Sequence, residues 1–145
     1  MNSDDNFIYD NIASNNLRHG IYLGDSDDNL ITMNSANDNT LNGIQLLSSN
    51  SNSITSNTAN NNVNGTNLIW SDDNIIFGNN LANNMYCYNE TSSFDNIYET
   101  NICQAPAAPS APFDPFILGL IIGLVIGFRA LAAVLILTFL RGRKE

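Results

Sequence analysis

Apolar and polar positions repeat along the first hundred residues with a period of 22 or 23 residues. The tetrapeptide Ser-Asp-Asp-Asn begins at positions 3, 26 and 71, and degenerate copies of it begin at positions 49 and 93. A large side chain follows two residues after each closing asparagine, and a second asparagine follows five residues after it. The large residues are Ile8, Ile31, Ile54, Ile76 and Tyr98, and the second asparagines are Asn11, Asn34, Asn57, Asn79 and Asn101. Such self-similarity at a fixed period predicts a solenoid.

The short apolar runs inside each repeat favour β-strands over helices. Segments such as 29–32 and 43–46 hold two apolar residues each, and Asn, Gly and Asp separate these runs. No segment spaces apolar residues as an amphipathic helix does, and no repeat has the leucine cluster of a leucine-rich repeat. Asn, Asp and Gly tolerate the left-handed backbone that sharp turns require. We therefore expect an all-β fold, a single-stranded, right-handed parallel β-helix over residues 3–103.

Equivalent residues of neighbouring coils lie about 4.8 Å apart in such a fold, so like side chains stack on one another. We expect the isoleucines to form an inward column and the asparagines to form a ladder that satisfies buried turn amides. The fourth coil departs from the pattern, because Cys87-Tyr88-Asn89-Glu90 stands where earlier coils have Gly-Ile-x-Leu. This departure predicts the end of the regular stack.

The repeated pattern Asn-x-Ile-x-x-Asn, followed by Gly-Ile-x-Leu-x-x-Ser-x-x-Asn, resembles the parallel β-helix repeats of the pectate-lyase-like superfamily. Within that superfamily it is most similar to the NosD-like branch. The resemblance covers about residues 3–103 and implies the β-helix fold. The branch includes copper-delivery proteins, carbohydrate-active enzymes and surface proteins, so the resemblance alone does not choose among these functions.

Most of the apolar residues outside the repeats lie in the C-terminal quarter. Residues 105–115 form a stiff Pro/Ala linker, and residues 116–140 are almost wholly apolar. At about 1.5 Å per residue, such a segment crosses a bilayer of about 30 Å as one tilted helix. The basic tail, residues 141–145, faces the cytoplasm by the positive-inside rule. We therefore expect a β-helix over residues 1–104 outside the cell membrane, anchored to the bilayer by a single transmembrane α-helix.

Within the predicted transmembrane helix, Gly119, Gly123 and Gly127 are four residues apart and share one face. Small residues on one face let two membrane helices approach closely, so this face is a candidate for homo-dimer packing. Arg129 faces away from it, because successive residues of a helix turn by about 100°.

The first six residues, Met1 to Asn6, do not resemble a secretion signal. Two interpretations remain open. Either the chain is the C-terminal fragment of a longer surface β-helix, which we favour, or it is a tail-anchored protein whose β-helix lies in the cytosol.

The charge of the repeat region excludes one class of partner. Residues 1–112 carry twelve acidic side chains and a single basic one, Arg18, for a sum of −11. An acidic domain repels phosphate backbones, so nucleic-acid binding is not expected. The acidic pairs are calcium candidates at Asp27, Asp28, Asp72 and Asp73. Calcium needs six to eight oxygen ligands, and we favour the interpretation of these residues as solvated turn residues.

Copper delivery needs several soft or imidazole ligands gathered together. His19 is the only histidine, and Met33 and Met85 fall on different coils. The copper role of the NosD-like branch is therefore not expected here, and no cofactor is predicted. Cys87 and Cys103, the only cysteines, are candidates for a disulfide that closes the last coil in an oxidising exterior, with free buried thiols as the alternative.

Two sequons, at Asn64 and Asn89, fit the N-glycosylation pattern. The acidic pairs also have the residue types of a glycosidase, but an acidic-sugar site would need basic residues, and only Arg18 and His19 are available. We therefore expect a non-enzymatic surface protein, a structural, display or adhesion module that binds surface glycans or a neighbouring surface protein. The alternative is the terminal piece of a carbohydrate-active β-helix enzyme, a lyase, hydrolase or epimerase, whose catalytic coils lie upstream.

Overall fold

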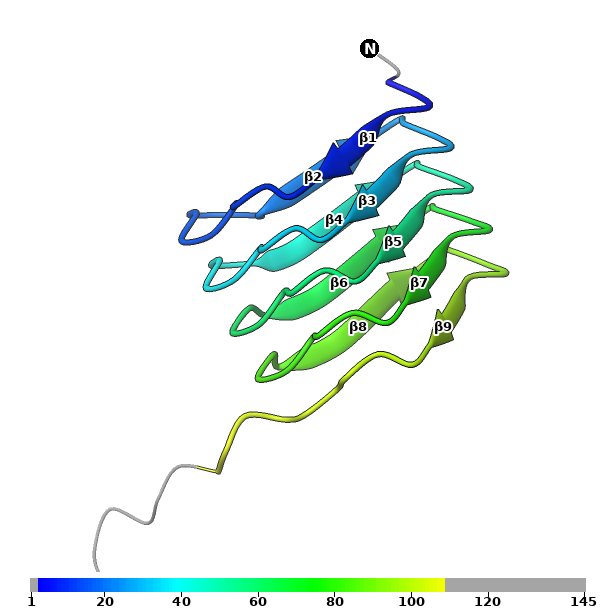
Figure 1. Cartoon of the computed structure of the whole chain (residues 1–145). Coiled ribbons are helices and arrows are strands. Elements are labelled where there is room, and N and C mark those ends of the chain that lie inside the picture. Colours follow the sequence, from blue (N-terminus) through cyan, green and yellow to red (C-terminus); the bar gives the residue numbers. More distant parts are fainter. Residues whose placement is uncertain (1–2, 109–145) are drawn as a thin grey trace, which may run out of the picture. The chain divides into compact units, whose positions relative to one another are not determined.

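The computed structural model describes residues 3–108, which form a parallel β-solenoid of about four turns (Figure 1). Within these residues there is no helix of the length and hydropathy that a bilayer crossing requires. The predicted membrane helix at 116–140, its three glycines, Arg129 and the basic tail lie outside the described residues.

Each of the first four coils contributes one short strand to each of two parallel sheets, and the partial fifth coil adds a strand to one of them (Figure 1). The five-stranded sheet contains β1 (Phe7–Tyr9), β3 (Leu30–Thr32), β5 (Ser53–Thr55), β7 (Ile75–Phe77) and β9 (Ile97–Glu99). The four-stranded sheet contains β2 (Ile21–Gly24), β4 (Asn42–Leu47), β6 (Asn64–Ile69) and β8 (Tyr86–Thr91). Both sheets follow chain order, so every coil lies on the one before it.

The predicted isoleucine column is present in the interior. In the five-stranded sheet, Ile8 is paired with Ile31, Ile31 with Ile54, and Ile54 with Ile76. The three central isoleucines have no exposed surface, and Ile8 is partly buried against the same core. The opposite sheet supplies a second apolar column that includes the fully buried Leu46. The core is therefore a stack of thin layers, and each coil depends on its neighbours for burial.

One side of the interior is narrow because only small side chains meet there. An inward column of alanines (Ala13, Ala36 and Ala59) lies opposite a column of glycines (Gly20, Gly43 and Gly65). A Cβ atom on Gly43 would lie 2.5 Å from the Cβ atom of Ala59 and 2.8 Å from the carbonyl oxygen of Gly65. Glycine is therefore required at position 43 because the next coil packs closely against it, and not because the backbone adopts a special angle there.

The corners of the coils use left-handed backbone almost entirely without glycine. Among residues 3–108, positive φ angles occur at eighteen positions, seventeen of them non-glycine residues and the other Gly78. Every one of these residues is followed directly by an asparagine or a serine. The repeat unit of a corner is thus a left-handed residue followed by a polar residue whose side chain turns inward.

The inward asparagines form ladders in which each coil satisfies the coil before it. Asn57 shows the pattern, because its Oδ1 accepts hydrogen bonds from the backbone N–H of Asn34 at 2.9 Å and from Nδ2 of Asn34 at 3.0 Å. The Nδ2 of Asn57 donates to the carbonyl of Ile31 at 2.8 Å. The predicted asparagine ladder is present as two ladders, one of the asparagines that close each Ser-x-x-Asn segment and one of the asparagines five residues later. A third ladder, which the sequence repeat did not reveal, accompanies them. The third ladder consists of Asn16, Asn39, Asn62 and Asn84.

A fourth corner carries serine in place of asparagine. Here the backbone N–H of Ser49 donates to Oγ of Ser71 at 3.1 Å, and the hydroxyl of Ser49 donates to the carbonyl of Leu47 at 3.0 Å. The shorter serine side chain serves the same purpose where the chain leaves the four-stranded sheet.

The coil length changes once, from 23 residues in the first two coils to 22 in the next two. The change arises at one turn, just before the glycine column. Three residues stand between the third asparagine ladder and the glycine column in the first two coils, at 17–19 and 40–42. Only two stand there in the next two coils, at 63–64 and 85–86. The ladder and the strands on either side keep their register across this change. We call this segment the variable turn.

The fourth coil leads to the end of the described stack, as its departure from the repeat predicted. β8 still pairs with β6 from Tyr86 to Thr91 and β9 with β7, and these are the last strands of their sheets within residues 3–108. What changes is the filling of the interior. Tyr88 and Glu90 occupy the positions that Thr66 and Leu68 hold one coil earlier, so the aliphatic column ends in an aromatic and a carboxylate.

Candidate functional site

Arg18 and His19, the basic side chains of the repeat region, lie together at the variable turn of the first coil. With Tyr22 they line a hollow of about 390 Å³. The imidazole of His19 stacks on the ring of Tyr22, with their centroids 5.9 Å apart. The structure therefore brings a guanidinium, an imidazole and an exposed phenol to one place on an otherwise acidic domain.

The imidazole of His19 is biased toward its neutral form. Partial burial lowers the pKa of His19 below its ordinary value, and the positive charge of Arg18 lowers this pKa further. The Nδ1 atom of His19 is shielded from solvent and has no hydrogen-bond partner within residues 3–108. The guanidinium of Arg18 supplies the positive charge of the hollow.

Tyr22 also borders a second hollow, of about 500 Å³, at the outer end of the first coil. Apolar surface from Phe7, Ile8 and Leu23 lines this second hollow beside the amide groups of Asn6 and Asn29. Apolar and aromatic walls with a few well-placed polar groups are typical of ligand sites. Tyr22 did not stand out in the sequence, although its place after the inward Ile21 in an alternating strand could have marked it as outward-facing.

The calcium candidates split into two roles, neither of which assembles a cation site. An Oδ1 of Asp27 accepts the backbone N–H of Asn50 at 2.6 Å, and an Oδ1 of Asp72 accepts that of Phe94 at 2.8 Å. Asp28 and Asp73 are left-handed corner residues with φ of 58°. The coil that carries Asn50 separates the two pairs, and residues 3–108 contain no group of three His, Cys, Asp or Glu side chains placed to hold a metal ion.

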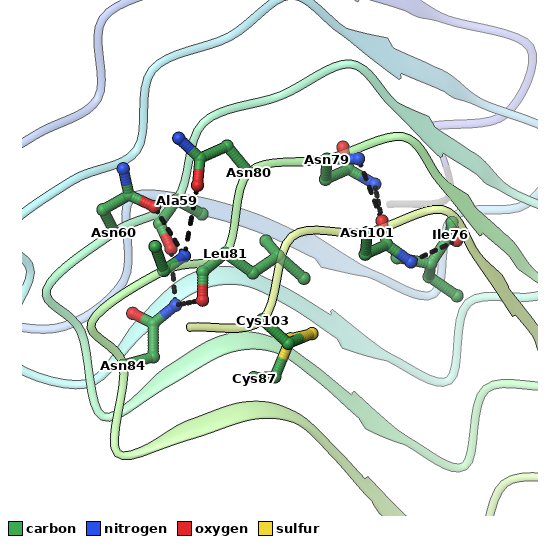
Figure 2. The surroundings of a disulfide bond; sticks show 11 residues. Ala59, Asn60, Ile76, Asn79, Asn80, Leu81, Asn84, Cys87, Asn101 and Cys103 are labelled. Carbon is green, nitrogen blue, oxygen red and sulfur yellow. Dashed lines mark hydrogen bonds between the residues drawn. A yellow bond between two sulfur atoms is a disulfide. The ribbon is translucent and has the colours of Figure 1, made fainter. Parts of the chain in front are cut away.

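Cys87 and Cys103 form a disulfide at the last coil (Figure 2). Their Cα atoms lie 5.4 Å apart, within the limit of about 7 Å that disulfide geometry sets. Cys87 continues the glycine column and Cys103 continues the alanine column, after Leu81 in the coil above. The covalent bond therefore replaces, in the last coil, the tight glycine–alanine contact of earlier coils.

Two tyrosines and a glutamate close the same end of the interior. The rings of Tyr88 and Tyr98 stack with centroids 4.2 Å apart, and the hydroxyl of Tyr98 donates to Oε1 of Glu90 at 2.9 Å. Burial and this hydrogen bond raise the pKa of Tyr98 far above its ordinary value, so the phenol stays protonated. The aromatic pair covers the apolar column where no further described coil covers it.

The remaining predicted residues are dispersed. Met33 and Met85 are exposed on different coils, far in sequence from His19. Asn64 and Asn89 lie on the outer side of the four-stranded sheet, where their side-chain amides donate to Asn42 at 2.7 Å and to Asn67 at 2.9 Å. N-glycosylation at these two asparagines stays a prediction.

Comparison with known proteins gives one match. Residues 1–107 match the family model described as "Periplasmic copper-binding protein (NosD)". No curated protein and no solved structure matches the chain.

Proposed function

Because the chain belongs to the NosD family, whose model covers residues 1–107, we propose that it is a non-enzymatic display and adhesion module held at the outer face of a cell membrane. In this proposal the solenoid is a right-handed parallel β-helix that carries a glycan-binding surface. Residues 105–115 act as its spacer and residues 116–140 as its membrane anchor.

The observation that carries the proposal is the disulfide between Cys87 and Cys103. Disulfides persist in the periplasm and outside the cell and are rare in the cytosol, where thiols are kept reduced. This agrees with the periplasmic location in the family's description. Closing a loop of about 16 residues by such a bond stabilises a domain by about 3 kcal/mol, which matters for a thin core.

Two properties of the sequence support the anchor and its orientation. The apolar segment 116–140 is long enough to span a bilayer, and the basic residues after it favour a cytoplasmic C-terminus. We further propose that the face with Gly119, Gly123 and Gly127 packs two such helices into a homo-dimer.

The residues of this chain do not fit the copper site that the family description implies. Both thiols are consumed by the disulfide, and a disulfide sulfur is not the thiolate that binds Cu(I). The imidazole of His19 is stacked on Tyr22, whereas Met33 lies at a different corner and Met85 lies in the variable turn three coils later. We therefore derive no copper chemistry for the solenoid.

Glycan binding is supported by the paired hollows around Tyr22. An exposed aromatic ring offers a flat apolar face, while Arg18 and the exposed side chain of Asn6 offer hydrogen-bond partners. The solenoid also assigns structural and binding roles to different residues. The inward residues are fixed by the hydrogen-bond ladders, whereas the outward residues vary from coil to coil, as Asp10, Met33 and Ser56 do at one corner.

The topology can be tested with cells whose outer layer admits protease and whose cytoplasmic membrane stays sealed. We expect external proteinase K to cut the linker, release the solenoid and leave a membrane-bound stub that contains residues 116–145. A cytosolic marker protein should survive the same treatment. Protection of the solenoid until the membrane is broken would contradict the proposal and favour a cytosolic, tail-anchored protein.

The glycan-binding surface can be tested by substitution of Tyr22. Binding of the full chain to an immobilised panel of neutral and uronate-containing oligosaccharides should fall at least about tenfold in Tyr22→Ala, because one buried aromatic contact contributes more than 1 kcal/mol. The matched control is Tyr86→Ala, a similarly exposed tyrosine on the same sheet but in the last coil. Equal binding by both variants would remove Tyr22 from the site.

A further inference from the structure

Trp70 is out of place as a corner residue. It adopts a φ of 49°, at a corner where the other coils have Asp25, Ser48 and Ser92. A left-handed conformation costs a bulky residue about 1–2 kcal/mol, and short polar residues tolerate it better. The strain is not offset by packing, because 61% of the Trp70 surface is exposed and its indole stacks on no other ring within residues 3–108. Such an outlier points to a role outside the fold.

A second exposed aromatic lies on the turn directly next to Trp70. The backbone N–H of Trp70 donates to the carbonyl of Thr91 at 3.0 Å, and that of Asp73 donates to the carbonyl of Phe94 at 3.1 Å. These bonds stack the turn at 70–74 on the turn at 92–96, and 67% of Phe94 is exposed. In earlier coils the position of Phe94 holds Asp or Asn, whose oxygen accepts an N–H from the next coil.

Two exposed carboxylates lie on the same turns as the two aromatics. Asp73 and Asp95 are exposed corner residues of the same two turns, with φ of 58° and 56°. Ile75 and Ile97, which begin β7 and β9, add exposed apolar surface beside them. We call these six residues the Trp70 surface. It combines aromatic faces, aliphatic area and negative charge.

The chemistry of the Trp70 surface indicates a positively charged partner. The net charge of −11 over residues 1–112 repels anionic lipid headgroups, nucleic acids and a second copy of this domain. Lys and Arg side chains satisfy every feature at once, because the cation is attracted by an aromatic face and by carboxylates while its methylene stem packs on apolar surface. We propose that the Trp70 surface docks a protein segment that presents Lys or Arg side chains.

The test uses the full chain in non-ionic detergent and a fluorescent octalysine peptide as the probe. Trp70→Ser introduces the residue found at the same corner in two other coils, so the domain should fold with an equal or higher thermal midpoint. We expect its affinity for octalysine to fall about two- to fivefold, as one exposed cation–π contact predicts. The control variant is Tyr86→Ser, an exposed aromatic at the opposite end of β8 from the Trp70 corner, which should bind octalysine as the unmodified chain does.

A charge-matched pair of variants separates the Trp70 surface from the general charge of the domain. Asp73→Asn with Asp95→Asn should weaken octalysine binding more than Asp10→Asn with Asp38→Asn, which removes the same charge at corners elsewhere. Equal losses in the two double variants, or unchanged binding in Trp70→Ser, would overturn the proposal. These outcomes do not depend on Tyr22, so the result is separable from the proposed glycan site.

Discussion

Replacing Ile54 with aspartate is expected to unfold the solenoid. Ile54 has no exposed surface and lies between Ile31 and Ile76 in the middle of the isoleucine column. The aspartate would bury a charge with no cationic partner, at a cost that exceeds several kcal/mol. Native domains are stable by only about 5–15 kcal/mol, and this one has a thin core. Loss of the β-sheet signal in circular dichroism at 25 °C would be the measurement.

The control for this substitution is Ile75→Asp, directly beside the column in sequence. Ile75 points outward from β7 and is exposed, so its replacement should change the free energy of unfolding by less than about 1 kcal/mol. A folded Ile54→Asp variant, or an Ile75→Asp variant that unfolds instead, would show that the inward and outward faces are assigned wrongly.

Replacing Asn57 with alanine should destabilise the solenoid by about 3–5 kcal/mol. The side chain of Asn57 is buried and joins three coils through its bonds to Asn34, to the carbonyl of Ile31 and to Oδ1 of Asn79 at 3.0 Å. Alanine would leave several buried polar groups without a partner, and each such group costs about 1–3 kcal/mol. The change is measured as a shift of the urea unfolding midpoint.

Asn89→Ala is the matched control for the ladder. Asn89 is exposed and makes a single side-chain hydrogen bond, to Asn67, so its loss should cost about 1 kcal/mol or less. Similar costs for the two variants would contradict the view that inward asparagines hold the coils together while outward ones do not.

The coil architecture was predictable because the inward residues must repeat. Ile31 and Asn34 face their equivalents one coil away, so packing and hydrogen bonding impose the same residue at the same interval. The third asparagine ladder is as regular as the other two, because its members stand ten residues after each closing asparagine in all four coils. Outward asparagines nearby, such as Asn15 and Asn61, obscure this period in the sequence.

The candidate sites were predictable only in part, because outward residues carry no repeat. Arg18 and His19 could be named as the available basic residues, but their grouping with Tyr22 depends on how the first coil bends. The left-handed conformation of Trp70 could not be predicted for a different reason. Only the structure shows that each residue with a positive φ is followed by Asn or Ser, and a tryptophan would not be expected at such a position.

The variable turn has a consequence for how such a chain can diversify. It gains or loses a residue between the first two coils and the next two, while the ladder before it and the strand after it stay in register. A flexible surface loop lengthens at little entropic cost, since each doubling of its length costs only about 0.6 kcal/mol. After duplication of a coil, this segment can therefore drift, grow and acquire new side chains without selection against misfolding. Arg18 and His19 lie in this segment, so a new specificity could evolve there through changes in length as well as in side chain, whereas the other corners of the described coils keep a fixed length.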